Sequence, residues 1–173
     1  AFVASNLEAM GIPYQHGIAG TGVVALIKGQ NPEKQCIALR ADLDALPIHE
    51  ENEVAYKSKK QGIMHACGHD VHTTCLLGAA VVLNQLKNEF EGTIKLIFQP
   101  GEERLPGGAS MMINEGVLEN PKVDKILALH VYPSMDVGKV GFKPGLYMAA
   151  CDELYLTIKG KGGHAALPNA YNN

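Results

Sequence analysis

Residues 64–72 of the chain read MHACGHDVH, and an apolar run follows at 73–86. The nine residues hold one thiol, three imidazoles and one carboxylate. Thiolate and neutral imidazole are preferred ligands of first-row metal ions, and zinc accepts both. Apolar residues recur at helical spacing over 73–87, so we expect the cluster at a helix N-terminus, where the helix dipole favours a thiolate. The alternative is a histidine-rich surface loop in which Cys67 is merely buried.

Each of three predicted strands is followed by side chains that can bind a metal ion. The strands span 36–41, 93–98 and 125–129. The side chains that follow them are, in order, Asp42 and Asp44, Glu102 and Glu103, and His130. Ligands bind at the carboxyl ends of strands in open α/β sheets, so this convergence predicts a site at one sheet edge. Taken singly, each acidic pair has a simpler interpretation, as a turn or a solvated loop.

Hydrophobic spacing predicts the remaining elements. The predicted helices span 2–10 and 107–116, with Met111 and Met112 as core residues of the second. The predicted strands span 13–16, 21–28, 138–142 and 154–159. In the last of these, apolar and polar residues alternate, which is typical of a strand with one buried face.

Composition excludes several classes of protein. The chain has 173 residues, of which 46% are hydrophobic and 19% charged, and a formal net charge of −3. This composition is ordinary for a soluble globular protein. Without a basic run, we expect no nucleic-acid partner. No apolar stretch is long enough to span a membrane, and no signal peptide is visible.

The four cysteines do not resemble a disulfide framework. We expect Cys36 and Cys75 to be small buried hydrophobic residues, and Cys151 to be structural. Only Cys67 has neighbours that could share a metal ion. Reduced cysteines suit a cytoplasmic protein.

Four motifs occur in order, at 40–48 (RADLDALPI), 65–70 (HACGHD), 99–103 (QPGEE) and 160–168 (GKGGHAALP). In these motifs the chain resembles the amidohydrolase branch of the di-metal aminoacylase and carboxypeptidase family. That branch includes hippurate hydrolase, N-acyl-amino-acid amidohydrolases and plant indole-acetyl-amino-acid hydrolases. The resemblance runs from the first residues to Pro168. It is specific for the family but not for the substrate.

The resemblance implies an α/β fold, with a mixed, mostly parallel sheet flanked by helices, as in zinc exopeptidase-like catalytic domains. Residues 1–150 would form this catalytic domain, which is incomplete because relatives are longer. Residues 151–173 would begin a smaller α+β lid or dimerisation domain. We therefore expect the chain to be part of a longer protein that forms a homodimer through the lid domain.

The resemblance also implies residue roles. The ligands of two divalent metal ions would be Cys67, His69, Glu103 and His130. Zinc is the expected metal, and manganese, cobalt or nickel could replace it. Glu102 would be the general base, although the residue types alone leave the order of Glu102 and Glu103 open. The family has a further ligand histidine near its C-terminus, and no residue here corresponds to it.

Two other roles are implied for residues that are not metal ligands. Asp42 would orient a ligand histidine, as carboxylates behind metal sites commonly do. His164 would stabilise the developing oxyanion, in its own or in a neighbouring subunit. Without the resemblance, His164 would be interpreted as a loop histidine beside flexible glycines.

The other polar residues of the motifs have simpler interpretations. Asp70 is expected to cap the following helix. We expect His65 and His72 to support the ligands or start the helix rather than bind metal, and His16 and His49 to lie on the surface.

The expected function is hydrolysis of the amide bond of N-acyl amino acids, by water that the metal ions activate and Glu102 deprotonates. One alternative is a metallo-carboxypeptidase or dipeptidase with the same site. A second alternative, from a different class, is a truncated, non-catalytic metal-binding module.

Overall fold

The computed structural model describes residues 1–149, 152–167 and 169. The chain divides into two units, residues 1–134 and 135–173, and each is described by itself. No helix among the described residues is long and apolar enough to cross a membrane. The predicted domain boundary at 150–151 lies outside the described residues and stays a prediction.

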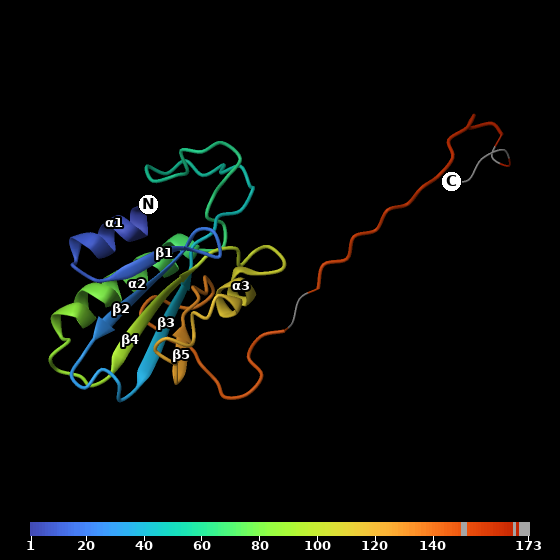
Figure 1. The fold of residues 1–173 in the computed structure, drawn as a ribbon. Coiled ribbons are helices and arrows are strands. Elements are labelled where there is room, and N and C mark those ends of the chain that lie inside the picture. Colours follow the sequence, from blue (N-terminus) through green and yellow to red (C-terminus); the bar gives the residue numbers. More distant parts are fainter. Residues whose placement is uncertain (150–151, 168, 170–173) are drawn as a thin grey trace. The chain divides into compact units, whose positions relative to one another are not determined.

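A five-stranded mixed sheet forms the centre of the first unit (Figure 1). In sheet order its strands are β1 (Tyr14–Ile18), β2 (Gly22–Lys28), β4 (Thr93–Gln99), β3 (Cys36–Asp42) and β5 (Lys125–Ala128). The pairs β1–β2 and β2–β4 are antiparallel, whereas β3 is parallel to both β4 and β5. The carboxyl ends of β4, β3 and β5 therefore meet at one edge of the sheet, as the sequence predicts.

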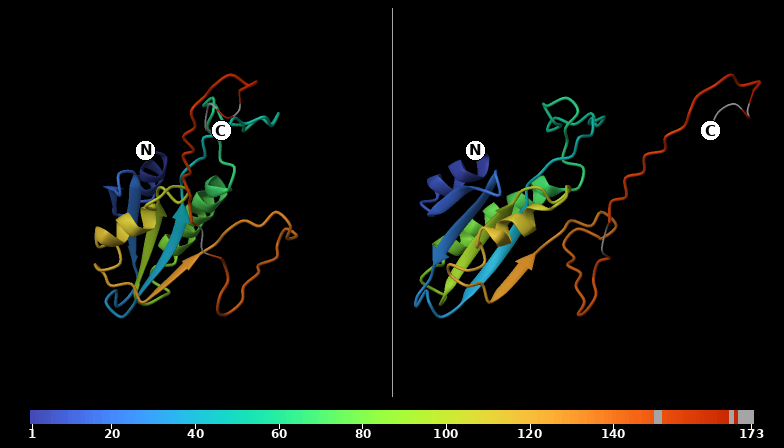
Figure 2. Two further views of the ribbon diagram at one scale, coloured as in Figure 1. Left: turned by 90° about the vertical axis from the view of Figure 1, so that its right-hand side faces the viewer. Right: turned by 45° about the vertical axis from the view of Figure 1, so that its right-hand side comes forward.

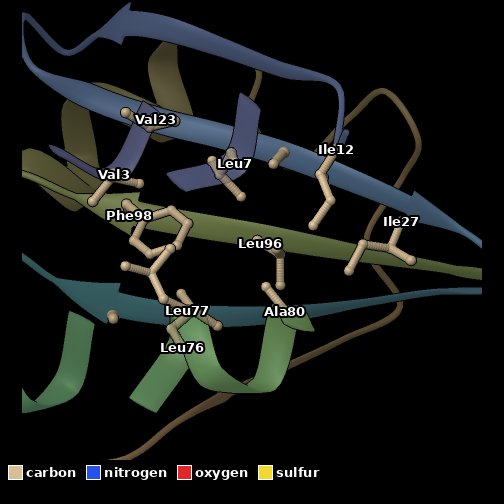
Figure 3. Packing of buried hydrophobic residues seen from close by; sticks show 12 residues of the cluster. Val3, Leu7, Ile12, Val23, Ile27, Leu76, Leu77, Ala80, Leu96 and Phe98 are labelled. Carbon is tan, nitrogen blue, oxygen red and sulfur yellow. The ribbon is translucent and has the colours of Figure 1, made fainter. Parts of the chain in front are cut away.

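Three helices cover the two faces of this sheet (Figure 2). Helices α1 (Phe2–Ala9) and α2 (His69–Gln85) pack on one face, and α3 (Gly108–Asn114) packs on the other. Successive side chains of a strand point to opposite faces of the sheet. Phe98 of β4 therefore faces α1 and α2, while its neighbour Ile97 faces α3. Figure 3 shows Phe98 and Leu96 in one apolar layer with Leu7 of α1 and Leu77 of α2. Full burial of each such side chain contributes about 1.5–3 kcal/mol.

Lys95 is a buried cation on the α3 face of the sheet. It is 1% exposed, and its Nζ donates to the carbonyl oxygens of Val117, at 2.6 Å, and Pro121, at 2.7 Å. Burial lowers the pKa of Lys95 below its ordinary value. These bonds attach β4 to the crossover that leads from α3 to β5. At the end of that crossover, the Asp124 carboxylate accepts the backbone N–H of Cys36 at 2.8 Å and aligns β5 with β3.

Every helix and strand predicted before residue 130 is present, with ends that shift by a few residues. The largest shift is at α2, which begins at His69 instead of residue 73. The prediction that Cys75 is buried is wrong, because Cys75 lies on the outer side of α2, between the buried residues Thr73 and Leu76. Met112 is a core residue as predicted, whereas Met111 is 41% exposed, since α3 buries only one side.

The two strands predicted in the second unit are absent from the described residues. Residues 138–142 and 154–159 form no regular structure, and Leu154, Leu156 and Ile158 are exposed. A strand needs a neighbour to accept and donate its backbone hydrogen bonds. The described residues supply no neighbouring strand for either segment, and the alternating pattern alone does not make a strand. Cys151 lies outside the described residues.

Candidate metal centre

The predicted ligands of the first unit converge where β3, β4 and β5 end and α2 begins. Three parts of the chain bring them there. Cys67 and His69 stand at the start of α2, Glu102 and Glu103 follow β4, and His130 follows β5. The described residues contain three groups of side chains whose possible ligand atoms lie within 4.8 Å of one another. These groups are Cys67, His69 and His130; His69, Glu102 and Glu103; and Asp42, His69 and His72.

A left-handed residue, Gly68, separates the two predicted ligands at the start of α2, Cys67 and His69. Its φ is +85°, and the helix begins directly after it. The chain turns at Gly68, so Cys67 and His69 are not arranged as neighbours on one face of an extended strand. The prediction that Asp70 caps the helix is also wrong. Gly68 is the N-cap, no side chain caps it, and Asp70 lies in the first turn, where its charge still suits the helix dipole.

His69 presents an unused nitrogen to a group of carboxylates. Its Nδ1 lies 3.0 Å from the backbone oxygen of Asp44, which can only accept, so Nδ1 carries the proton. The other nitrogen, Nε2, is buried and has no hydrogen-bond partner among the described residues. It lies 3.9 Å from Glu102 Oε2 and 3.8 Å from Glu103 Oε1. A buried lone pair that faces anionic oxygens beyond hydrogen-bond distance fits a cation.

Cys67 and His130 form the other half of the centre. Cys67 Sγ lies 3.5 Å from His130 Nε2. His130 Nδ1 lies 2.8 Å from the carbonyl oxygen of Val131, so Nδ1 carries the proton and Nε2 turns its lone pair toward the sulfur. Burial raises the pKa of Cys67 to about 11, with a further contribution from the carboxylate of Glu103. A cation at this position would replace the thiol proton.

Asp42 ends β3 and is 1% exposed. Its Oδ1 accepts from His72 Nδ1 at 2.6 Å, and its Oδ2 accepts from Arg40 Nη1 at 2.8 Å. Burial tends to raise the pKa of Asp42, but the hydrogen bond from His72 and the charge of Arg40 outweigh it, so the pKa is lowered overall. Asp42 Oδ2 is 3.7 Å from His69 Nε2, and the direct bond to a histidine goes to His72 instead.

Asp44 and His72 are parts of the site that the sequence argument left without a specific task. The Asp44 backbone oxygen holds His69, and its Oδ2 accepts the backbone N–H of Glu103 at 3.1 Å. Asp44 thereby joins the β4 loop to α2. His72 is 4% exposed and accepts the N–H of Val131 at 2.9 Å. The sequence signal that could have identified Asp44 is its position, two residues after Asp42 and just beyond a buried strand.

The remaining predicted residues lie apart from this cluster or in the other unit. His16, His49 and His65 are exposed. His164 belongs to the second unit, where its Nδ1 accepts the backbone N–H of Ala166 at 3.2 Å and its side chain is exposed.

Comparison with known proteins gives consistent matches. Residues 38–171 match the family model of peptidase family M20/M25/M40. An N-acetyl-L-cysteine deacetylase of Bacillus subtilis is 47% identical over 169 residues, which cover 98% of this chain and 40% of that protein. An N-acyl-L-amino acid amidohydrolase of Geobacillus stearothermophilus is 43% identical over 168 residues, 97% of this chain and 45% of that protein.

A solved structure is also similar. The Bacillus subtilis YXEP protein, a dinuclear metal binding peptidase from the M20 family, superposes with a TM-score of 0.78 at 42% identity. The superposition covers 83% of this chain and 40% of that protein. The chain thus spans about two fifths of the length of the curated relatives it matches.

Proposed function

The chain belongs to peptidase family M20/M25/M40, and on this premise we propose that it carries most of the metal centre of an amidohydrolase acting on N-acyl amino acids. The observation that carries the proposal is the buried, unpartnered Nε2 of His69, which faces Glu102 and Glu103 beside the Cys67–His130 pair. The names of two similar proteins, a deacetylase and an N-acyl-amino-acid amidohydrolase, support this substrate class.

We propose that two divalent ions are held by Cys67, His69, Glu103 and His130. Thiolate and imidazole ligands favour zinc, and a carboxylate-rich site also accepts manganese, cobalt or nickel. When bound, such ions polarise a substrate carbonyl and lower the pKa of water. The third group in the structure, which contains His72, is a poorer candidate because both nitrogens of His72 already have partners.

The two adjacent glutamates differ in ways that support different roles. Glu103 is the less exposed, at 27% against 43% for Glu102. Its backbone N–H is held by Asp44, and its carboxylate contributes to the raised pKa of the Cys67 thiol. A fixed, partly buried carboxylate suits a ligand. The greater exposure of Glu102 supports contact with water and substrate, and we assign it the proton transfer from water to the leaving amine.

His164 is proposed to donate a hydrogen bond to the substrate carbonyl oxygen as negative charge develops there. Its place in a glycine-rich segment, which has the conformational freedom to adjust to a bound substrate, supports this role. We also propose that the protein is cytoplasmic and forms a homodimer through the region that begins at residue 151. Free thiols at Cys36, Cys67 and Cys75 support the first of these two proposals.

Hydrolysis assays on the intact gene product test the proposed function. Acetyl-, benzoyl- and aminoacyl-amino acids are compared after chelation and after the return of zinc, manganese or cobalt. We expect metal-dependent hydrolysis, fastest with the acetyl or benzoyl substrates. Preference for aminoacyl substrates would indicate a carboxypeptidase or dipeptidase instead. Stoichiometric metal with no hydrolysis of any substrate would indicate a metal-binding module.

A further inference from the structure

His72 lies buried between the end of the sheet and the segment that carries His130. We propose that His72 is a positioning residue, which with Asp42 holds His130 toward the metal centre. The inference deepens the proposed function and rests on it, since it takes His130 as a ligand. It assigns a task to a histidine that is itself no ligand.

The hydrogen bonds of His72 define its protonation. Nε2 accepts the backbone N–H of Val131 at 2.9 Å, so Nε2 carries no proton and the ring proton is on Nδ1. Nδ1 donates this proton to Asp42 Oδ1 at 2.6 Å. Both nitrogens are therefore used, and no lone pair is left for a metal ion. Arg40 accounts for the second oxygen of Asp42, so the carboxylate cannot turn away from His72 without losing a bond.

A continuous series of hydrogen bonds leads from His72 to His130. His72 holds the N–H of Val131, and the carbonyl oxygen of the same residue accepts from His130 Nδ1 at 2.8 Å. This second bond is the one that directs His130 Nε2 toward Cys67. The rings of His72 and His130 are also in contact, with centroids 4.4 Å apart at an interplanar angle of 65°. His72 thus restrains both the backbone and the ring of the ligand.

A second contact restrains the side chain of Val131. A Cβ built on Gly68 would lie 2.4 Å from Val131 Cγ2, so the absence of a side chain there lets Val131 pack against the start of α2. The segment continues from β5, whose backbone is paired with β3, but it has little apolar support. All four residues of β5 are exposed, and Leu129 is 69% exposed. Apolar burial therefore does little to fix His130, and the polar contacts of His72 carry most of its orientation.

Cobalt binding by the intact gene product tests this inference without reliance on activity. Co²⁺ is titrated in competition with a chelator of known affinity, and the thiolate-to-cobalt absorption reports the environment of Cys67. We expect His72→Ala to weaken Co²⁺ binding by about 10–100-fold, the usual loss when the partner of a ligand is removed. His72→Gln, whose amide can still donate and accept, should recover part of that loss. The exposed His16→Ala is the matched control and should bind as the wild type does.

Two further measurements separate positioning from folding. Hydrolysis by His72→Ala should fall at limiting metal and recover when metal is in excess, which a general loss of structure would not allow. Circular dichroism checks that each variant is folded. If His72→Ala is unfolded, the Asp42→Asn variant tests the inference instead. The single amide oxygen of Asn cannot replace both carboxylate oxygens, which accept separately from His72 and Arg40. The Co²⁺ affinity of Asp42→Asn should therefore fall.

Wild-type affinity in folded His72→Ala would overturn the inference, as would wild-type affinity in Asp42→Asn if His72→Ala does not fold. Failure of the proposed function looks different. Co²⁺ binding without hydrolysis by the wild-type protein would contradict that function alone, whereas no Co²⁺ binding by the wild-type protein would contradict both proposals.

Discussion

Cys67 Sγ lies 3.5 Å from His130 Nε2, although the two residues are 63 positions apart in the chain. The contact joins the start of α2 to the segment after β5, across the end of β3. It pairs a thiol with the free nitrogen of an imidazole, two groups that bind the same metal ions. This contact therefore predicts that metal binding depends on the Cys67 thiol.

Cys67→Ser should lose at least one of the two metal ions, because a hydroxyl is a far poorer ligand than a thiolate for zinc or cobalt. Cys36→Ser and Cys75→Ser should keep their metal, since neither thiol belongs to any of the three candidate groups. Elemental analysis of the three purified variants measures this. Equal metal content in all three would contradict the assignment.

Metal binding should strengthen as pH rises. The pKa of Cys67 is about 11 in the metal-free chain, mainly through burial, so the thiol is protonated at neutral pH and a bound ion must displace its proton. Below that pKa, affinity should rise by about tenfold per pH unit for one displaced proton. Calorimetry in two buffers of different ionisation enthalpy counts the protons released. Cys67→Ser should release one proton fewer for each ion it still binds there, and an unchanged count would refute this explanation.

Glu102→Gln and Glu103→Gln should fail in different ways. If Glu102 is the base, its amide keeps shape and metal but cannot accept a proton, and kcat should fall by at least about 10²–10⁴-fold. Glu103→Gln should instead lose metal, because a neutral amide is a weaker ligand. Metal content and kcat of both variants are measured together. Metal loss in the first variant with retention in the second would mean that the roles are exchanged.

Gly68→Ala should destabilise the chain more than Gly62→Ala. Both glycines have positive φ, +85° and +72°, so each alanine incurs roughly 1–2 kcal/mol of backbone strain. Only at residue 68 would the new Cβ also meet Val131, at 2.4 Å, whereas nothing lies within 4 Å at residue 62. Urea unfolding of both variants gives the difference. Equal losses would show that the Val131 contact is unimportant for stability.

The strands and their ends could be predicted because their signals are local. Apolar runs define β3, β4 and β5, and the parallel arrangement then brings the residues that follow them to one edge. Cys67, His69 and the two glutamates could be named for the same reason, since each stands in a short motif beside such an element. Their proximity in the structure agrees with that prediction, and their catalytic and ligand roles stay predictions.

The partners of His72 and the task of Asp44 could not be predicted because they depend on residues distant in the chain. His72 binds Asp42 and Val131, which are 30 and 59 positions away. Nothing in the sequence near His72 indicates which nitrogen would be protonated or what it would face. The strand predicted at 154–159 fails for a related reason, since an alternating pattern reports a face that could be buried and says nothing about a neighbouring strand.

The buried Lys95 implies an order of assembly. Its partners, Val117 and Pro121, lie only 22 and 26 positions further along the chain. The Cys67–His130 contact, in contrast, joins residues that are 63 positions apart. Loop-closure entropy makes the longer contact costlier by roughly 1 kcal/mol. We therefore expect the crossover between α3 and β5 to be in place before the ligands meet. The metal centre would then be added to a finished scaffold, and removal of its ions should leave the sheet folded.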